Sequence, residues 1–397
     1  MRTIHVLWGL FALLPPQDGA TTLRVVSDFP GGSAQVDGID QEQRVVKIQP
    51  AERTGHGWRC WWYFRLDGIR PGETVTVEVE GDPFTLPDRA HFSPDGKTWC
   101  HTEAGARADK RVTYRQAVEG SSAWFAWGPP YLLADAEAAV RNAAAVCRES
   151  AAFTLCTSRD GHAVPAIRFG PEKIDSSRFG LWIQARQHAW ESGGSWVAQG
   201  FLEWLASDAA EAKTLRERSS ITIVPIMDID NVQRGAGGKD QIPQDHNRDW
   251  SARPQHPEVR AAMERILEMD RAGAFDVFLD LHNPSAGEKR PYFFLPAAEI
   301  RSDKGRRNEE RLIAAARERV AAPLEFAEKM KISGPNYDKN WKRISNSWIA
   351  WNLKEHVIGA TLETPWNTPA STIEGYKAVG RELGEALERY LRESPRK

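Results

Sequence analysis

The sequence has few cysteines and no excess of either charge, and both features exclude some classes of function. Its 397 residues include four cysteines, none of them in a CxxC pair, so they lack the spacing of a paired zinc-binding motif. The 52 basic and 54 acidic residues give a formal net charge of −2. Nucleic acid and anionic membranes are therefore not expected as partners.

The cysteines leave two interpretations open. Cys60 and Cys100 fall in the first of two domains predicted below, and Cys147 and Cys156 fall in the second. Two local disulfides would require this distribution. Free buried thiols explain it as well, because a sequence does not show whether two cysteines lie close enough to bond.

The apolar run at the N-terminus, residues 4–14, is too short to span a bilayer. It follows Arg2 and precedes a polar stretch, an order typical of a secretory signal peptide. His5 and the poor cleavage motif before Ala20 argue against export. We expect a signal peptide over residues 1–20 and a secreted or periplasmic protein, with a cytoplasmic protein as the alternative.

Residues 22–130 are predicted to form a β-sandwich domain. Hydrophobic residues make up 41% of the chain and charged residues 27%, a balance typical of a globular protein large enough for two domains. In this first region, short runs alternate apolar and polar residues, and Gly and Pro separate them. Period two with frequent turn residues predicts antiparallel strands, which we expect at 44–48, 60–66, 74–79, 111–115 and 123–127.

Residues 133–397 show a different pattern, in which buried apolar runs alternate with helical segments. This alternation predicts an α/β domain with a mixed, mostly parallel sheet flanked by helices, and an active site at the strand ends. The expected strands are 181–185, 221–226, 277–281 and 357–362. The expected helices are 134–146, 195–205, 257–269, 304–319 and 373–391.

Candidate metal ligands follow two of these strands. His188 and Glu191 stand three residues apart in the loop after strand 181–185, and His282 directly follows strand 277–281. Imidazole and carboxylate ligands suit zinc, and a catalytic zinc site uses three protein ligands and leaves the fourth position to water. Asp280, two residues before His282, is expected to orient that ligand or to be structural. Taken singly, the HxxE spacing is weak evidence, since a surface His and a solvated Glu also explain it, and His282 is also compatible with a hydrogen-bonded His at a strand end.

Glu363 is a candidate general base. It follows the apolar strand 357–362, and burial at a strand end can raise the pKa of a carboxyl group into the working range of a base. A carboxylate at the rim of the cleft is the alternative.

In this order the residues resemble the zinc metallocarboxypeptidases, and within them the cytosolic-carboxypeptidase-like branch. The branch has HPGE where residues 188–191 read HAWE, and a β-sandwich before its catalytic domain, where residues 61–65, 72–74 and 95–99 look like its signature. The resemblance implies one zinc ion on His188, Glu191 and His282, with Glu363 as general base. It also implies that Asn247 and Arg248 bind the terminal carboxylate of a peptide, for which a guanidinium fork is suited.

Two features depart from the family pattern. The expected NPDG turn reads Asp228-Ile-Asp-Asn, and the arginine expected to neutralise the oxyanion falls at Gly238. Arg234 and Lys239 are the candidates to replace its charge. Tyr337 is the candidate for the tyrosine that caps the substrate. The specificity pocket is expected between 340 and 351, where the candidates are Trp341, Lys342, Arg343, Ser345 and Trp348.

Three functions fit these motifs. The first is a zinc carboxypeptidase that acts on the C-termini of peptides or acidic tails. The second is a zinc-dependent deacylase of small N-acyl amino acids, because related deacylases share the ligand pattern. The third is a weakly active or inactive peptide-binding protein on a peptidase scaffold, which the missing arginine would explain. The Asn247-Arg248 pair and the long β-sandwich favour peptides.

Overall fold

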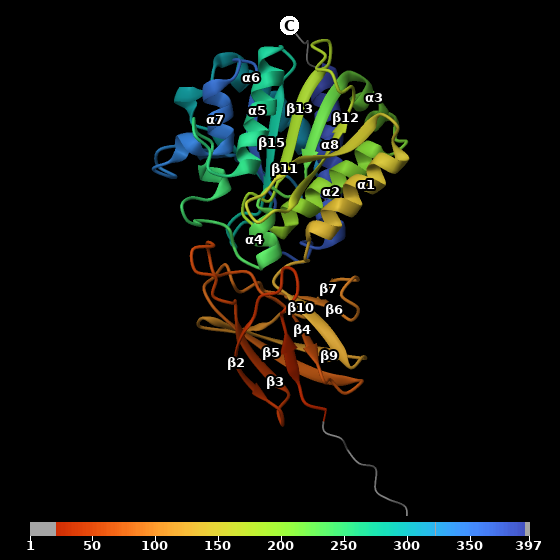
Figure 1. Cartoon of the computed structure of the whole chain (residues 1–397), viewed down its shortest axis with the longest axis vertical. Helices are drawn as coiled ribbons and strands as arrows, with labels where there is room; N and C mark the ends of the chain where they lie inside the picture. The colour runs from red at the N-terminus through yellow and green to blue at the C-terminus, as the bar shows by residue number, and fades with distance from the viewer. Residues whose placement is uncertain (1–20, 322, 394–397) are drawn as a thin grey trace, which may run out of the picture.

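A computed structural model describes residues 21–321 and 323–393, so the predicted signal peptide lies outside the described residues. The molecule has two parts stacked along its long axis (Figure 1). Strands β1–β10 form the first part, called the sandwich below, and the later elements form the α/β part. No helix in the described ranges is long and apolar enough to cross a membrane.

The sandwich has two five-stranded sheets around one apolar core. Along β5, Val75, Val77 and Val79 are buried and alternate with half-buried residues, so one face of the strand points into the core. The first sheet has the order β1 (Arg24–Val26), β4 (Tyr63–Asp67), β10 (Ser122–Ala126), β6 (His91–Ser93) and β7 (Cys100–His101). The second has the order β2 (Gln35–Asp40), β3 (Val45–Gln49), β5 (Glu73–Glu80), β9 (Arg111–Val118) and β8 (Ala106–Ala108). The pairs are antiparallel as predicted, except that β3 and β5 run parallel.

The α/β part contains one mixed sheet of eight strands. Their order is β11 (Ser150–Thr157), β12 (Ala163–Phe169), β14 (Ser219–Val224), β13 (Phe179–Ala185), β15 (Val277–His282), β18 (Ile358–Glu363), β16 (Tyr292–Pro296) and β17 (Lys331–Ser333). The four central strands β14, β13, β15 and β18 are parallel and match the four predicted strands. All their residues are buried except Ser220 of β14, which is half-buried. Their carboxyl ends therefore lie at one edge of the sheet.

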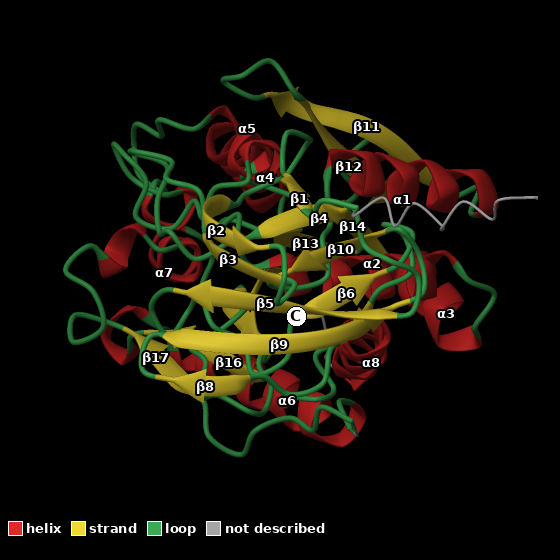
Figure 2. Cartoon of the chain, turned by 90° about the horizontal axis from the view of Figure 1, so that it is seen from below, coloured by secondary structure: helices red, strands yellow, loops and turns green. Residues whose placement is uncertain are grey.

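Helices cover both faces of this sheet. They are α1 (Leu133–Val146), α2 (Ser192–Ala206), α3 (Ala210–Arg218), α4 (Ile229–Arg234), α5 (Pro257–Arg271), α6 (Asp303–Arg319), α7 (Ser345–Asn352) and α8 (Ile373–Glu393). Three short 3-10 helices are η1 (His246–Arg248), η2 (Ala298–Ile300) and η3 (Trp341–Arg343). Side chains of α2, α6 and α8 fill one apolar cluster, and those of α5 and α7 fill another. Figure 2 shows these two groups of helices toward opposite sides of the molecule.

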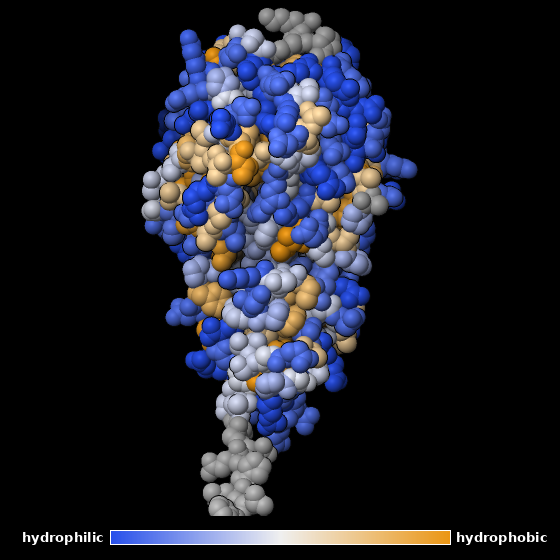
Figure 3. All heavy atoms as spheres, turned by 90° about the vertical axis from the view of Figure 1, so that its right-hand side faces the viewer, coloured by the Kyte–Doolittle hydropathy of each residue, from blue (hydrophilic) through white to orange (hydrophobic). Residues whose placement is uncertain are grey.

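The predicted fold class is confirmed, since an α/β part with a mixed sheet follows two mainly antiparallel sheets. The outer strands β11, β12, β16 and β17 and the short helices α3, α4 and α7 were not predicted. All four cysteines are free, so neither of the two local disulfides is formed. The face in Figure 3 is mainly hydrophilic with scattered apolar groups, as expected when the apolar residues fill the core.

Candidate metal centre

Three of the predicted site residues converge at the carboxyl ends of β13 and β15. His188 lies in the loop after β13, Glu191 directly precedes α2, and His282 ends β15. Nδ1 of His188 lies 2.7 Å from Oε1 of Glu191, and Nδ1 of His282 lies 2.6 Å from Oε2 of the same carboxylate. One ligand atom from each residue lies within 4.8 Å of the others, and all three side chains are buried.

A glycine in the first turn of α2 makes this convergence possible. A Cβ atom on Gly194 would lie 2.6 Å from the carbonyl oxygen of Leu281, closer than such atoms approach in proteins. Because Leu281 directly precedes His282, the missing side chain lets the start of α2 lie against the end of β15. Glu191, at the N-cap position of α2, is thereby brought to His282.

Each histidine has a carboxylate near its second ring nitrogen. Nε2 of His282 lies 3.0 Å from Oδ2 of Asp280, and Nε2 of His188 lies 3.6 Å from Oδ1 of Asp245. The 3.0 Å contact lets Asp280 orient the ring of His282 so that its Nδ1 carries the free lone pair. The 3.6 Å separation at His188 is longer than a hydrogen bond, so Asp245 acts on that ring through its charge. Asp280 lies where it was expected, whereas the position of Asp245 was not predicted. Its place two residues before Asn247 is the one feature of the sequence that could have indicated it.

The carboxylate of Glu191 is stabilised in its charged form by the two histidines that it contacts. Burial alone would raise the pKa of Glu191, but the charges of His188 and His282 outweigh it and hold the pKa well below its usual range.

The two rings are inclined by 66° with centroids 4.9 Å apart, so their in-plane lone pairs can meet at one point. Nε2 of His188 has no hydrogen-bond partner among the described residues. Two imidazoles and one carboxylate form the donor set of a three-ligand zinc site, and these residues fit a metal ion.

Glu363 lies beside this cluster. It ends β18, and the strand register places it opposite His282 on β15. The residue is 9% exposed, and its Oε2 has no hydrogen-bond partner in the described chain. Burial raises the pKa of Glu363 to about 8, although the charge of His282 opposes the shift. A carboxyl group with a free oxygen and a pKa near neutral can accept and release a proton.

Asn247, on η1, lies next to His282, and Arg248 follows Asn247 in the same short helix. Nδ2 of Asn247 is 3.4 Å from Nε2 of His282, and its Oδ1 accepts a 2.9 Å hydrogen bond from the backbone N–H of Ser345. Arg248 donates from Nε to Oδ2 of Asp338 at 2.9 Å and from Nη1 to the carbonyl of Asn247 at 3.0 Å. These bonds fix the guanidinium, and Nη2 makes no hydrogen bond to the described residues. It is available to bind a carboxylate.

The two candidate replacements for the missing arginine lie in different surroundings. Arg234 forms an ion pair with Asp160 and donates to Oδ1 of Asn231 at 3.1 Å. The charge of Lys239 instead acts on carboxylates of the site. Burial raises the pKa of Glu363, and Lys239 is among the charges that oppose this shift. The pKa of Asp245 lies well below its usual range, because His188, Lys239 and Arg248 together outweigh its burial. The backbone N–H of Trp190 donates to the carbonyl of Gly237 at 3.0 Å, so the segment that carries Lys239 lies against the loop with His188 and Glu191. Arg234 is engaged elsewhere.

Tyr337 and the residues between 340 and 351 differ in their relation to the site. The ring of Tyr337 lies 5.9 Å from Cζ of Arg248 and is 49% exposed, a suitable place for a residue that contacts substrate. Ser345 donates from Oγ to Asp280 at 2.6 Å. Trp341 and Trp348 are buried in apolar clusters, Lys342 lies over the ring of Trp351, and Arg343 is exposed. Only Ser345 of these five candidates has a described contact with the predicted site residues.

His246, His256 and Glu258 form a second buried group of ligand-type side chains. The two rings stack with centroids 3.8 Å apart at an angle of 24°, so their lone pairs run side by side and do not converge. Nε2 of His256 already lies 2.9 Å from the carbonyl of Gln244. Burial alone would lower the pKa of His246, but the carboxylates of Asp228 and Glu258 raise it to about 9. Because the stacked rings do not converge and His256 is already engaged, we interpret the group as a structural cluster in which a charged His246 lies between carboxylates.

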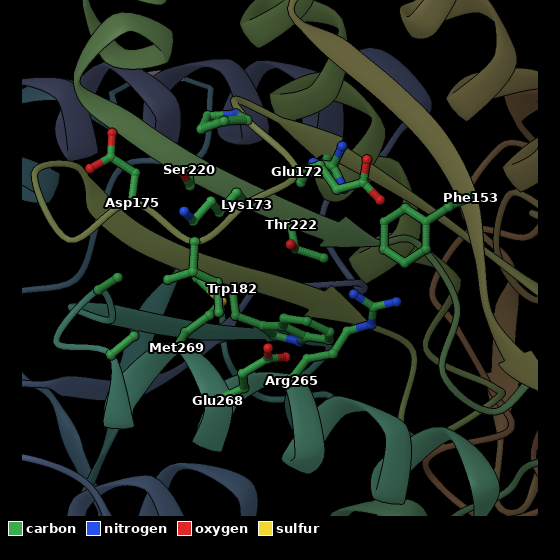
Figure 4. A pocket seen from close by; sticks show the side chains of 15 residues that line it. Phe153, Glu172, Lys173, Asp175, Trp182, Ser220, Thr222, Arg265, Glu268 and Met269 are labelled. Atoms are coloured by element: carbon green, nitrogen blue, oxygen red, sulfur yellow. The ribbon is translucent and has the colours of Figure 1, made fainter.

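A cavity of about 610 Å³ opens toward the amino-terminal ends of the central strands, opposite the end that carries the metal cluster (Figure 4). It lies near the amino-terminal ends of β13 and β14, where Trp182, Ser220 and Thr222 line it. Phe153 and Arg265 lie side by side in it, with the guanidinium 4.9 Å above the ring. No predicted site residue lines this cavity, so it is separate from the metal cluster.

No protein-family model matches the chain. The chain is 26% identical over 287 residues to an uncharacterised protein of Zymomonas mobilis, which covers 70% of this chain and 71% of that protein. It is 22% identical over 321 residues to cytosolic carboxypeptidase 1 of Danio rerio, and 37% identical over 299 residues to that of Mus musculus. These matches cover 68% and 62% of this chain but only 28% and 24% of the two carboxypeptidases. The chain thus spans about a quarter of their length.

Solved structures share the fold over nearly the whole chain. A metallo-carboxypeptidase from Burkholderia cenocepacia superposes with a TM-score of 0.80 and 22% identity, over 94% of this chain and 99% of that one. A metallo-carboxypeptidase from Pseudomonas aeruginosa superposes with a TM-score of 0.76 and 22% identity, over 93% and 99%. Both matches include the sandwich as well as the α/β part, because neither part alone accounts for this coverage.

Proposed function

Because the chain belongs to the metallocarboxypeptidases, with cytosolic carboxypeptidases among its relatives, we propose that it is a zinc-dependent carboxypeptidase. Its substrate would be the C-terminal peptide bond of a peptide. One observation carries this proposal. The ligand atoms of His188, Glu191 and His282 converge beside Glu363 and within reach of Asn247.

His188, Glu191 and His282 would hold one zinc ion through two Nδ1 atoms and a carboxylate oxygen. A bound zinc ion would supply a Lewis acid for the scissile carbonyl and lower the pKa of a water molecule. Asp280 orients the ring of His282 from 3.0 Å, and the charge of Asp245 lies 3.6 Å from the outer nitrogen of His188, so both Nδ1 atoms are directed at Glu191. Such partners commonly change metal affinity by about 10- to 100-fold when they are removed.

Glu363 takes a proton from the attacking water and passes it to the leaving amine. The accepting atom is Oε2, which no other described group occupies. Because the pKa of Glu363 is raised toward neutral by burial, the same carboxyl group can accept the first proton and release it in the second step. General acid–base transfer of this kind contributes roughly 10²- to 10⁴-fold to the rate.

Arg248 and Asn247 bind the carboxylate at the end of the peptide. Asp338 and the carbonyl of Asn247 fix the guanidinium from two sides, so the remaining Nη2 group meets the ligand in one orientation. Binding at this point fixes the distance between the end of the peptide and the metal cluster. It therefore selects the last peptide bond.

Lys239 supplies the positive charge that faces the oxygen of the scissile carbonyl as that oxygen becomes negative. The proposal rests on the packing of residues 237–238 against residues 189–190 of the metal-binding loop and on the engagement of Arg234 by Asp160. The charge of Lys239 also acts on Glu363 and Asp245. A donor to such an oxygen is worth about 2.7–4 kcal/mol in other hydrolases. An ammonium group has no fork geometry, so Lys239 acts as a point charge.

Product mass spectrometry on a peptide library tests the function. Zinc-loaded protein is expected to release single C-terminal residues from peptides with a free carboxylate. The same peptides with amidated C-termini are the matched control and should remain intact, as should all peptides after chelation. Hydrolysis of N-acyl amino acids without cleavage of peptides would assign the deacylase function instead. Absence of any metal-dependent hydrolysis would leave a binding protein.

A further inference from the structure

The sandwich contacts the loops that carry the predicted catalytic groups. Trp190 stands between His188 and Glu191, and Trp366 follows Glu363 by three residues. Both indoles belong to the apolar core of the sandwich, where each packs on Trp127, with ring centroids 5.1 Å and 4.6 Å away. The sandwich thus supports the metal-binding loop and the loop after the general base at the same time.

A third contact holds the backbone on both sides of Lys239. Residues 55–58 of the sandwich run along residues 238–242 and form three backbone hydrogen bonds of 2.9 Å. They join the N–H of Gly238 to the carbonyl of His56, the N–H of Trp58 to the carbonyl of Lys239, and the N–H of Ile242 to the carbonyl of Gly55. The loop with Lys239 therefore depends on a segment more than 180 residues earlier in the chain.

Gly57 lets the two segments approach this closely. A Cβ atom at Gly57 would lie 2.5 Å from the carbonyl oxygen of Lys239, and its φ of +90° disfavours any side chain. The next residue, Trp58, then reaches the lysine side chain. Nζ of Lys239 lies 5.3 Å from the centroid of the Trp58 ring, a cation–π contact. Nε1 of Trp58 donates to Oδ2 of Asp240 at 2.8 Å, which fixes the plane of the indole.

We propose that the sandwich completes the active site, with Trp58 as the positioning residue that keeps the ammonium of Lys239 in the cleft. Four rotatable bonds would otherwise let a half-buried lysine turn to bulk water. The indole of Trp58 also stacks on Trp190 of the metal-binding loop, with ring centroids 6.4 Å apart, so its face offers the ammonium a favourable place beside that loop. The bond to Asp240 keeps the face in place. This inference rests on the proposed role of Lys239 and adds a function for the sandwich in the same reaction.

A double-mutant cycle on the full-length, zinc-loaded protein tests this coupling. Trp58→Leu keeps an apolar side chain but removes the ring face, and is expected to lower kcat by about 2- to 30-fold, the range of a cation–π contact. KM should change less, because Arg248 and Asn247 still bind the terminal carboxylate. Trp58→Phe, which keeps a ring face, should restore most of the activity. In a Lys239→Met background, Trp58→Leu should have no further effect.

A matched control uses another tryptophan of the sandwich. Trp124 is also half-buried and also lies under a cation, since Cζ of Arg65 is 5.8 Å from its ring. Trp124→Leu should leave kcat unchanged, because this pair lies on β10 and β4 and contacts no residue of the site. An equal loss of activity from Trp58→Leu with and without Lys239 would overturn the proposal. It would show that Trp58 acts through its stacking contact with Trp190 and not through Lys239.

A second measurement does not depend on enzymatic activity. Acetylation of Lys239 by an N-hydroxysuccinimide ester is followed by peptide mass spectrometry in the wild type and in Trp58→Leu. If Trp58 shields and orients the amine, the variant should be labelled several-fold faster, while other lysines are labelled at unchanged rates. Unchanged labelling of Lys239 would refute the contact itself. Failure to find a peptidase substrate would affect the proposed function and leave this result intact.

Discussion

Replacement of Glu363 by glutamine separates proton transfer from metal binding. Glutamine has nearly the shape of glutamate, so a side chain that is only 9% exposed can be exchanged without leaving a cavity. The amide group, however, cannot accept a proton. His188, Glu191 and His282 remain in place, because the ligand set does not include Glu363.

The expected loss for Glu363→Gln follows from the role of the lost group. Removal of a general base costs roughly 10²- to 10⁴-fold in kcat, which corresponds to about 2.7–5.4 kcal/mol of transition-state stabilisation. Zinc content should stay at one ion per chain. KM should stay close to that of the wild type, because the guanidinium of Arg248 is held by Asp338 and Asn247.

The assay measures release of the last residue from a peptide with a free C-terminus, together with metal content and thermal unfolding. Glu288→Gln is the matched control. It makes the same chemical change at an acid that pairs with Lys331 on β17, and it should leave kcat nearly unchanged. If Glu363→Gln retained activity within tenfold of the wild type, Glu363 would not be the base. If the variant lost its zinc, Glu363 would belong to the ligand set and the assignment of roles would be wrong.

Three further predictions concern the surroundings of Glu363. His188→Ala should abolish stoichiometric zinc, whereas Asp245→Asn should weaken zinc binding by only about 10- to 100-fold, as measured by competition with a chelator; equal affinity in Asp245→Asn would show that the carboxylate does not act on the ring. Arg248→Lys should raise KM for free-acid peptides by at least about tenfold, because one ammonium replaces a fixed guanidinium; an unchanged KM would place the carboxylate site elsewhere. The pKa of His246 is raised to about 9, so the stabilisation from its charge is full below the unfolded value near 6.5 and is lost as the pH rises through 9. Urea unfolding of metal-free protein should therefore lose stability from pH 6 to pH 9, and His246→Gln should make that loss smaller by on the order of 1–3 kcal/mol. The raised pKa of Glu363 contributes to the same loss and remains in the variant; a loss of unchanged size in His246→Gln would contradict the buried imidazolium.

The pattern of apolar runs predicts most of the core elements. The four central strands and the helices α1, α2, α5, α6 and α8 match predicted segments to within a few residues, because each buries a continuous apolar face. The outer strands β11, β12, β16 and β17 escape prediction because they lie at or near the edges of the sheet. The parallel pairing of β3 with β5 was not predicted either, since alternation within a strand does not indicate the direction of its neighbour.

The candidate site is predictable for a related reason. His282 and Glu363 directly end buried parallel strands, and His188 lies in the loop after another. Carboxyl ends of parallel strands meet at one edge of the sheet, so residues far apart in the chain can be grouped from local patterns alone. No such pattern marks Asp245, whose carboxylate matters only because η1 brings it to the outer nitrogen of His188.

The choice between Arg234 and Lys239 depends on three-dimensional contacts. The two residues are five positions apart and carry the same charge at neutral pH, so local sequence cannot rank them. Asp160, from the loop between β11 and β12, binds Arg234, and Trp58, from the sandwich, lies under Lys239. A side chain's direction is determined by the partner that it meets, and these partners come from segments some 70 and 180 residues away. Local patterns therefore predict which residue types stand at the strand ends, while long-range packing determines which of the flexible charges near them faces the reaction.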